Sequence, residues 1–247
     1  MAQRKKPSPP RPADTPKNQG IPRPMLLAGV GAAALVAVLV VASLLLRGGD
    51  DKDATPAPSG DTALVDGIPQ NGTVLGDPEA RVTLLQYEDM QCPVCQRYDA
   101  DALPAIIEEY VRPGKVKLDF RGLHFIGDDS TKALRIVLAA AKQNKAWQMI
   151  ELLYARQGEE NGGWVTDALI DELAAKVEGL DAAKMLEDAK SAEIGRELDV
   201  VSDEAVERKV QGTPWFFISI DGGEPYEVRV PDLTPDAFRP VLDDALR

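Results

Sequence analysis

The chain has 247 residues, of which 44% are hydrophobic and 5% aromatic, a composition typical of a globular protein of one or two domains. Its net charge of −12 is uneven, because residues 1–24 carry +5 and the remainder therefore sums to −17. An acidic body disfavours nucleic-acid binding, which needs basic surface to neutralise phosphates, and is most simply a solvated surface.

Residues 1–24 are rich in proline, lysine and arginine and are predicted to form a disordered basic tail. Residues 25–46 carry no charge, and as a helix these 22 residues would span about 33 Å, enough for a hydrocarbon core of ~30 Å. A cleaved signal peptide is the main alternative, but its apolar region is usually shorter, at ~7–15 residues. We therefore predict a signal anchor, with the basic tail in the cytoplasm and residues 47–247 outside the membrane.

The segment 47–68 reads as a linker, and the folded domain is expected over 69–247. Residues 71–76 are a short strand candidate. Residues 81–87 have a nearly continuous apolar core, which predicts a buried, central strand.

A helix is predicted over 93–111, with Pro93 in its first turn and a kink at Pro104. Residues 115–121 alternate polar and apolar side chains, which predicts a strand with one face in water. This β-α-β order implies a right-handed crossover and a parallel pair of strands.

A helical block follows over about 128–209 and contains five predicted helices: 129–144, 145–157, 166–177, 181–190 and 192–209. Strands at 215–220 and 226–230 then predict a hairpin, in which Phe216 and Phe217 point to opposite faces. Thr234 is expected to cap a last helix that runs to Leu246.

The two cysteines of the chain, Cys92 and Cys95, stand where the predicted strand turns into the helix. A bridge between them would close a very short loop, so it would add little entropic stabilisation. Thiol–disulfide exchange is the chemistry that suits such a pair. Half of a metal site is the alternative, but zinc needs four ligands and the chain adds one histidine, His124, so no metal is expected.

A second motif, Gly212-Thr213-Pro214, stands directly before the strand at 215–220. Together with the dithiol, the helical block and the β-β-α ending, it resembles a membrane-anchored, DsbA-like thiol–disulfide oxidoreductase of the thioredoxin-fold superfamily. The resemblance implies an α/β, thioredoxin-like fold with a helical insertion, preceded by one transmembrane helix. It also implies that Pro214 is a cis-proline beside the dithiol and that Thr213 contacts the bound substrate chain. No cofactor is expected.

Cys92 is expected at the N-terminus of the helix and more exposed than Cys95. The helix dipole and the free N–H groups there stabilise a thiolate, and such thiols have pKa values of about 3.5–7.5 against ~8.5 for a free thiol. A substrate thiolate would attack the Cys92 sulfur, and a second substrate thiol would release Cys92. Cys95 would close back on Cys92 when a partner reoxidises the enzyme.

The chain departs from the family pattern at two places. Many relatives carry a buried acid six residues before the first cysteine, where this chain has Gln86. Glu88 and Asp89 could replace it as a proton relay, although the end of a strand usually exposes such residues and solvated turn acids are the simpler interpretation. Val94 stands where the DsbA pattern often has a histidine that stabilises the thiolate. We therefore expect a reduction potential less oxidising than about −120 mV.

The predicted function is to oxidise cysteines of reduced exported proteins to disulfides at Cys92 and Cys95. By resemblance, a quinone-linked membrane partner of the DsbB or VKOR type would reoxidise the pair. A thiol reductase or isomerase of the same fold is the nearest alternative. A non-enzymatic anchored module that binds polypeptides is the alternative from another class, and the intact dithiol disfavours it.

Overall fold

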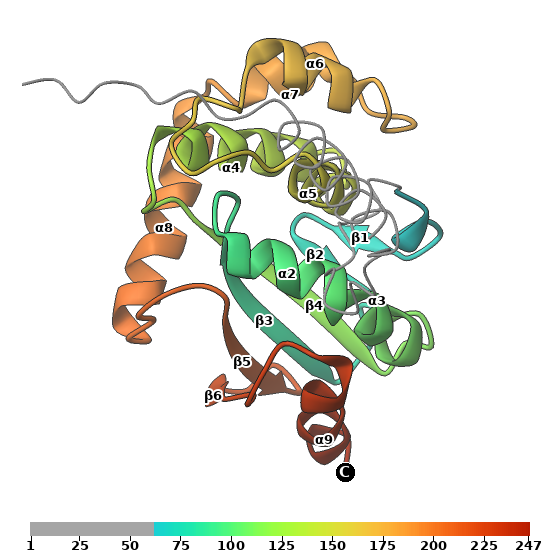
Figure 1. Cartoon of the computed structure of the whole chain (residues 1–247). Coiled ribbons are helices and arrows are strands. Elements are labelled where there is room, and N and C mark those ends of the chain that lie inside the picture. The colour runs from blue at the N-terminus through green and yellow to red at the C-terminus, as the bar shows by residue number, and fades with distance from the viewer. Residues whose placement is uncertain (1–61) are drawn as a thin grey trace, which may run out of the picture. The chain divides into compact units, whose positions relative to one another are not determined.

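The computed structural model describes residues 62–247 (Figure 1). The predicted tail at 1–24, the membrane anchor at 25–46 and most of the predicted linker lie outside the described residues. Within 62–247, no helix combines the length and the apolar character that crossing a membrane requires.

The folded body starts earlier than the predicted boundary at residue 69. Residues 62–64 form a short 3₁₀ helix, η1 (Thr62–Leu64), and the side chains of Val65 and Ile68 are buried in the core. Arg112 donates hydrogen bonds to the backbone carbonyls of Leu64 and Asp66. This end of the predicted linker is therefore part of the domain.

One mixed sheet organises the domain, with strands in the order β1-β2-β4-β3-β5-β6. The strands are β1 (Gln70–Asn71), β2 (Val74–Leu75), β3 (Val82–Asp89), β4 (Val116–Leu123), β5 (Trp215–Ile220) and β6 (Tyr226–Val228). β3 pairs parallel with β4 and antiparallel with β5, and β5 pairs antiparallel with β6. The predicted parallel pair and C-terminal hairpin are confirmed. The predicted strand at 71–76 is instead a tight hairpin of β1 and β2, which turns at Gly72 with φ +62°.

β3 is the central strand, as predicted, and both of its faces are covered. The predicted wet face of β4 is wrong, because only Lys117 and Arg121 of that strand are half-buried and the other residues are buried. Of the alternating polar residues of β4, Lys117 donates a hydrogen bond to the carbonyl of Pro78, and Arg121 forms ion pairs with Asp119 and with Glu204 of the helix α8 (Ala192–Glu207). The polar pattern therefore marks an ion-paired interface rather than solvent.

The helix predicted over 93–111 is divided into α2 (Pro93–Asp101), α3 (Leu103–Ile106) and a π-helical turn, η2 (Ile107–Val111). Pro104 explains the break, because a proline has no N–H and its ring clashes with the carbonyl four residues earlier. The expected kink lies at Ala102, whose backbone stays in the right-handed helical region and whose N–H still bonds to the carbonyl of Tyr98.

The helical insertion between β4 and β5 contains five helices, as predicted: α4 (Asp128–Ala141), α5 (Ala146–Ala155), α6 (Asp167–Ala174), α7 (Ala182–Asp188) and α8. Figure 1 shows α4 to α7 beyond the carboxyl ends of β3 and β4. The last helix is α9 (Pro235–Ala245). Thr234 precedes it as expected, but its hydroxyl donates to Asp232 and does not cap the helix.

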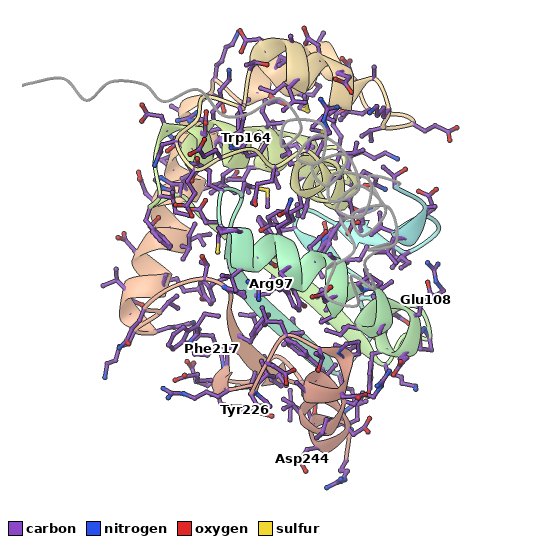
Figure 2. The ribbon with its side chains drawn as sticks, viewed as in Figure 1. Arg97, Glu108, Trp164, Phe217, Tyr226 and Asp244 are labelled. Carbon is purple, nitrogen blue, oxygen red and sulfur yellow. The ribbon has the colours of Figure 1, made fainter. Side chains whose placement is uncertain are left out.

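Apolar side chains pack on both faces of the sheet. On one face, Phe216 contacts Tyr98 of α2 and Phe238 of α9, with ring centroids 4.9 and 5.0 Å apart. On the other face, Phe217 packs with Tyr87 near α8. Phe217 is labelled in Figure 2. The two phenylalanines point to opposite faces, which confirms the prediction from strand periodicity.

Candidate active site

The dithiol lies where β3 ends and α2 begins. Cys92 is the N-cap residue of α2, and its Sγ accepts a hydrogen bond of 3.4 Å from the backbone N–H of Cys95. Pro93 occupies the first turn, where its missing N–H costs no helical hydrogen bond. Cys92 is 6% exposed and Cys95 is 0% exposed, and both are free thiols. Cys92 is therefore the sulfur that a partner can reach, as predicted.

The peptide bond between Thr213 and Pro214 is cis, which confirms the prediction for Pro214. The Cys92 thiol lies 3.4 Å from the carbonyl oxygen of Thr213 and donates to it. The loop before β5 is therefore in direct contact with the reactive sulfur, although 121 residues separate them in sequence.

The two thiols have opposite acidities. The hydrogen bond from the Cys95 thiol, with help from Thr213 and backbone N–H groups, lowers the pKa of Cys92 to about 6 against the opposing effect of burial. Burial raises the pKa of Cys95 well above its ordinary value, and the charges of Glu88 and Cys92 raise it further. At pH 7 the reduced pair therefore holds a Cys92 thiolate and a Cys95 thiol, with about ten thiolates per thiol at Cys92.

The helical insertion fixes the active-site turn through its side chains. Gln157, which follows α5, donates hydrogen bonds to the carbonyl oxygens of Met90, at 2.8 Å, and Cys92, at 3.2 Å. In the reverse direction, Gln96 of α2 donates a 2.7 Å bond to the carbonyl oxygen of Tyr154. The geometry of the dithiol thus depends on residues more than 50 positions away in sequence.

Glu88 and Asp89 are both buried, at 2% and 0% exposure. The interpretation as solvated turn acids is therefore wrong. The insertion covers the end of β3, and α4 and α5 supply hydrogen-bond partners to these two side chains. Nothing in the sequence around residue 88 predicts that the helical insertion buries these two side chains.

The two acids have different surroundings. Asp89 accepts hydrogen bonds from the backbone N–H of Gln91 at 2.9 Å, from the backbone N–H of Ile126 at 3.3 Å and from the hydroxyl of Ser130 at 2.5 Å. Burial raises the pKa of Asp89 above its ordinary value, and these bonds oppose the rise while they tie the active-site turn, the loop before α4 and α4 itself together. The position and the partners of Asp89 therefore indicate a structural role.

Glu88 lies on the other face of β3 and accepts a 2.8 Å hydrogen bond from the hydroxyl of Tyr154. Burial raises the pKa of Glu88 to about 8, against the effect of the Tyr154 bond, and the charges of Cys92 and Glu151 add to the rise. Gln86, on the same face, accepts a 2.6 Å bond from Tyr98. Of the two predicted relay candidates, Glu88 is the one whose charge acts on the dithiol.

Two further acids, Asp99 and Glu151, are buried near the dithiol, and each is 2% exposed. Neither was predicted as a site residue from the sequence. Asp99 follows Cys95 by four residues, so both lie on one face of α2. This spacing could have predicted from the sequence that Asp99 lies near the dithiol. Glu151 comes from α5, and no local pattern in the sequence connects it with the dithiol.

An open cleft of about 460 Å³ borders the dithiol and the cis-proline. Its lining includes Val94, Thr213, Pro214, Trp215, Val228 and Leu233. Val94 is 38% exposed, so it presents an apolar side chain between the two cysteines at the edge of this cleft. A cleft of this kind can hold an extended polypeptide against the reactive sulfur.

His124 lies in a second hollow, 3.3 Å from the hydroxyl of Thr131 and 3.4 Å from that of Ser202. These contacts indicate a structural role for His124. Among residues 62–247, no three His, Cys, Asp or Glu side chains are arranged to hold a metal ion.

Comparisons with known proteins agree with this geometry. A family model described as thioredoxin matches residues 69–244. A probable disulfide bond formation protein D of Bacillus cereus is 32% identical over 148 residues, which cover 59% of this chain and 68% of that protein. The oxidised crystal structure of BdbD from Bacillus subtilis aligns with a TM-score of 0.61 and 22% identity, over 72% of this chain and 97% of that one. DsbA2 of Pseudomonas aeruginosa aligns with a TM-score of 0.56 and 26% identity, over 73% and 97% of the two chains.

Proposed function

Because the chain belongs to the thioredoxin family, as a DsbA-like disulfide oxidoreductase, we propose that it forms disulfides in reduced polypeptides outside the cytoplasm. The observation that carries this proposal is the difference between its two thiols. Cys92 is reachable and acidic, whereas Cys95 is buried and weakly acidic. A dithiol of this kind releases Cys92 easily and therefore favours transfer of its disulfide to other thiols.

The reaction begins with the Cys92–Cys95 disulfide. A client thiolate attacks the Cys92 sulfur, a mixed disulfide forms and Cys95 leaves with the electron pair of the broken bond. A second client thiolate then attacks the client sulfur of the mixed disulfide and expels Cys92 as a stable thiolate. The client gains a disulfide, and the enzyme keeps two electrons and one proton on its dithiol.

Cys95 needs a proton when it leaves, because a thiolate at this buried position is unfavourable. Glu88 can supply it, since burial keeps this carboxyl protonated near neutral pH and its charge acts on Cys95. In the reverse direction, Glu88 would accept the proton of Cys95 when Cys95 attacks the mixed disulfide between Cys92 and a reoxidising partner. Glu88 takes over the task that relatives give to an acid at the position of Gln86.

The client chain would lie in the cleft beside Pro214. The Thr213 carbonyl, directly before Pro214, lies 3.4 Å from the Cys92 sulfur, and Val94 and Trp215 offer apolar contact to client side chains. Exported clients are unfolded when they meet the enzyme, so a shallow, largely apolar cleft suits them.

The proposed location rests on residues 25–46, which would anchor the domain to the membrane from outside, with residues 1–24 in the cytoplasm. A domain held at the membrane can meet a membrane-embedded reoxidase of the DsbB or VKOR type, and we propose such a partner. Labelling of an introduced cysteine at position 55 with a membrane-impermeant maleimide in intact cells tests the orientation. If the reagent does not label the cysteine at position 55, the proposed orientation is wrong.

Single cysteine variants test the reaction. Cys92→Ser should abolish oxidation of a reduced model protein, and Cys95→Ser should trap a mixed disulfide through Cys92 that a reducing gel resolves. Full turnover by Cys92→Ser would refute the mechanism. The redox state of the pair in cells tests the direction, because an oxidase is mostly disulfide and a reductase mostly dithiol.

A further inference from the structure

Two buried carboxyl groups meet at the interface of α2 and α5, beneath the dithiol. Asp99 belongs to α2, one turn after Cys95, and Glu151 belongs to α5, three residues before Tyr154. Both side chains are 98% buried, and they lie within hydrogen-bonding reach of each other. The proposed reaction assigns neither of them a role.

These carboxyls lack donors. Among the described residues, neither oxygen of Asp99 has a hydrogen-bond partner, and the Oε1 of Glu151 has none either. An ionised carboxylate can only accept hydrogen bonds, so two carboxylates in contact cannot satisfy each other. A proton on one of them supplies the missing donor, and the pair can then form one hydrogen bond between its own members.

The neighbouring side chains do not offer a substitute. The hydroxyl of Tyr98 donates to Gln86, and that of Tyr154 donates to Glu88. The Nε2 of Gln86 has no partner and bonds to neither carboxyl. The groups whose charge acts on the pair or on Glu88 are carboxyls and thiols from β3, α2 and α5, and no lysine, arginine or histidine of the described residues is among them.

We propose that Asp99 and Glu151 share one proton and act together as a positioning pair, which places a single negative charge beside Glu88. Full ionisation would leave two uncompensated charges in a buried site, which is costly. Full protonation would remove the charge that acts on Glu88. A single shared proton satisfies the contact and retains one charge.

The consequence for the reaction rests on the proposed function. A nearby negative charge disfavours ionisation of Glu88, so Glu88 still holds its proton when Cys95 is expelled. Glu88 then gives that proton to the Cys95 sulfur and becomes a carboxylate. The pair keeps its own proton throughout, so it acts through Glu88 and not on the sulfur.

Charge counting tests this arrangement, because amides can replace the carboxyls at nearly constant size. Above pH 8 the carboxyl of Glu151, whose pKa burial raises to about 8, is ionised, so the wild-type pair carries one negative charge. Asp99→Asn and Glu151→Gln each leave one carboxylate with an amide donor, so each single variant also carries one negative charge. The double variant carries none. The single variants are therefore matched controls for the double variant.

The readout is the rate at which reduced glutathione opens the Cys92–Cys95 disulfide, measured against pH. Loss of the Glu88 proton should slow this reaction at high pH. The double variant should show that decline about one pH unit lower than the wild type, as expected for removal of one nearby charge, and each single variant should follow the wild type. An unchanged double variant, or single variants that shift as far as the double one, would overturn the shared proton.

Infrared difference spectra give a second measurement that does not depend on turnover. At pH 9, above the pKa of about 8 of Glu88 and of Glu151, the wild-type protein should show the signal of a protonated carboxyl that both single variants lack and that Glu88→Gln retains. If the signal survives in either single variant, the pair does not share a proton. Glutathione is not a client, so both measurements remain informative even if the protein fails to oxidise client proteins, a result that would instead refute the proposed function.

Discussion

The two faces of the sheet bury carboxyl groups in opposite ways. On the face toward α8, Asp119 pairs with Arg121 at 2.8 Å, and Arg121 also pairs with Glu204 at 3.2 Å. On the face toward α2, Glu88, Asp99 and Glu151 lie together without a cation among the described residues that act on them. The same sheet therefore supports one charge-compensated cluster and one uncompensated cluster.

This difference separates structural from chemical roles. A carboxylate next to an arginine gains from ionisation and holds elements together. Buried carboxyls without a cation must either hold protons or share them, and such a proton can be given or taken when a neighbouring group changes charge. The uncompensated cluster is the one beneath the dithiol, where the proposed catalytic cycle moves a proton on and off Cys95.

Glu88→Gln should produce the largest effect. The amide keeps the size of the side chain but cannot transfer a proton, so the step in which Cys95 leaves should slow by about 10²-fold near pH 7. Stopped-flow fluorescence of the reaction with a reduced peptide measures this step.

Asp89→Asn is the matched control for that variant. It changes the adjacent acid, whose carboxylate accepts three hydrogen bonds from the loops around it. It should destabilise the fold by about 2 kcal/mol, because one amide oxygen cannot replace a charge at three donors, and it should slow exchange much less. If Asp89→Asn slowed thiol exchange as much as Glu88→Gln does, the assignment of a structural role to Asp89 and a proton-transfer role to Glu88 would be wrong.

Stability should depend on pH through the uncompensated cluster. Burial raises the pKa of Glu88 to about 8 in the folded protein, against ~4.3 for an exposed glutamate. Between these values the native state keeps a proton that the unfolded chain releases, so the free energy of unfolding falls as pH rises. From pH 6 to 8, Glu88→Gln should abolish about 2 kcal/mol of this fall.

Urea denaturation of the oxidised protein is the measurement, because the disulfide removes the thiols from the titration. In the reduced protein, the lowered pKa of Cys92 acts in the opposite direction and stabilises the native state as pH rises from about 6. Parallel curves for the wild type and Glu88→Gln would show that Glu88 is ionised at pH 6.

Arg121→Met tests the compensated face. The substitution leaves Asp119 and Glu204 without their shared cation, and it should cost about 2 kcal/mol, between the values for buried and for exposed ion pairs. The rate of thiol exchange should stay within twofold of the wild type, because the sheet separates this cluster from the dithiol. A large loss of rate would show that the two faces are not independent.

Much of the fold could be predicted because its signals are local. The periodicity of residues 81–87 predicts a central strand, and the dithiol followed by Pro93 predicts a helix start. Gly212-Thr213-Pro214 predicts the cis-proline only together with the dithiol. The strand and helix patterns each lie within a few residues, where backbone geometry and side-chain spacing determine the structure, whereas the cis-proline is implied by the family resemblance that the two motifs carry together.

The missed features come from contacts between distant segments. The polar residues of β4 suggest a wet face until α8 supplies a partner for Arg121. Glu88 looks exposed until α5 brings Tyr154 over it. The pairing of Asp99 with Glu151 joins helices 52 positions apart in sequence, so no local period could show it.

Gln157→Ala should give the smallest effect and shows how far the insertion supports the dithiol. The change removes the two hydrogen bonds to the carbonyls of Met90 and Cys92. These bonds join neutral groups and are partly buried, so their loss should destabilise the domain by about 1 kcal/mol. A looser turn places the Cys92 sulfur less well above the helix N-terminus, and its thiolate absorbance should titrate at a slightly higher pH. An unchanged titration would mean that β3 and α2 alone determine the N-cap geometry of Cys92. The insertion would then supply hydrogen-bond partners to the buried acids without orienting the thiol.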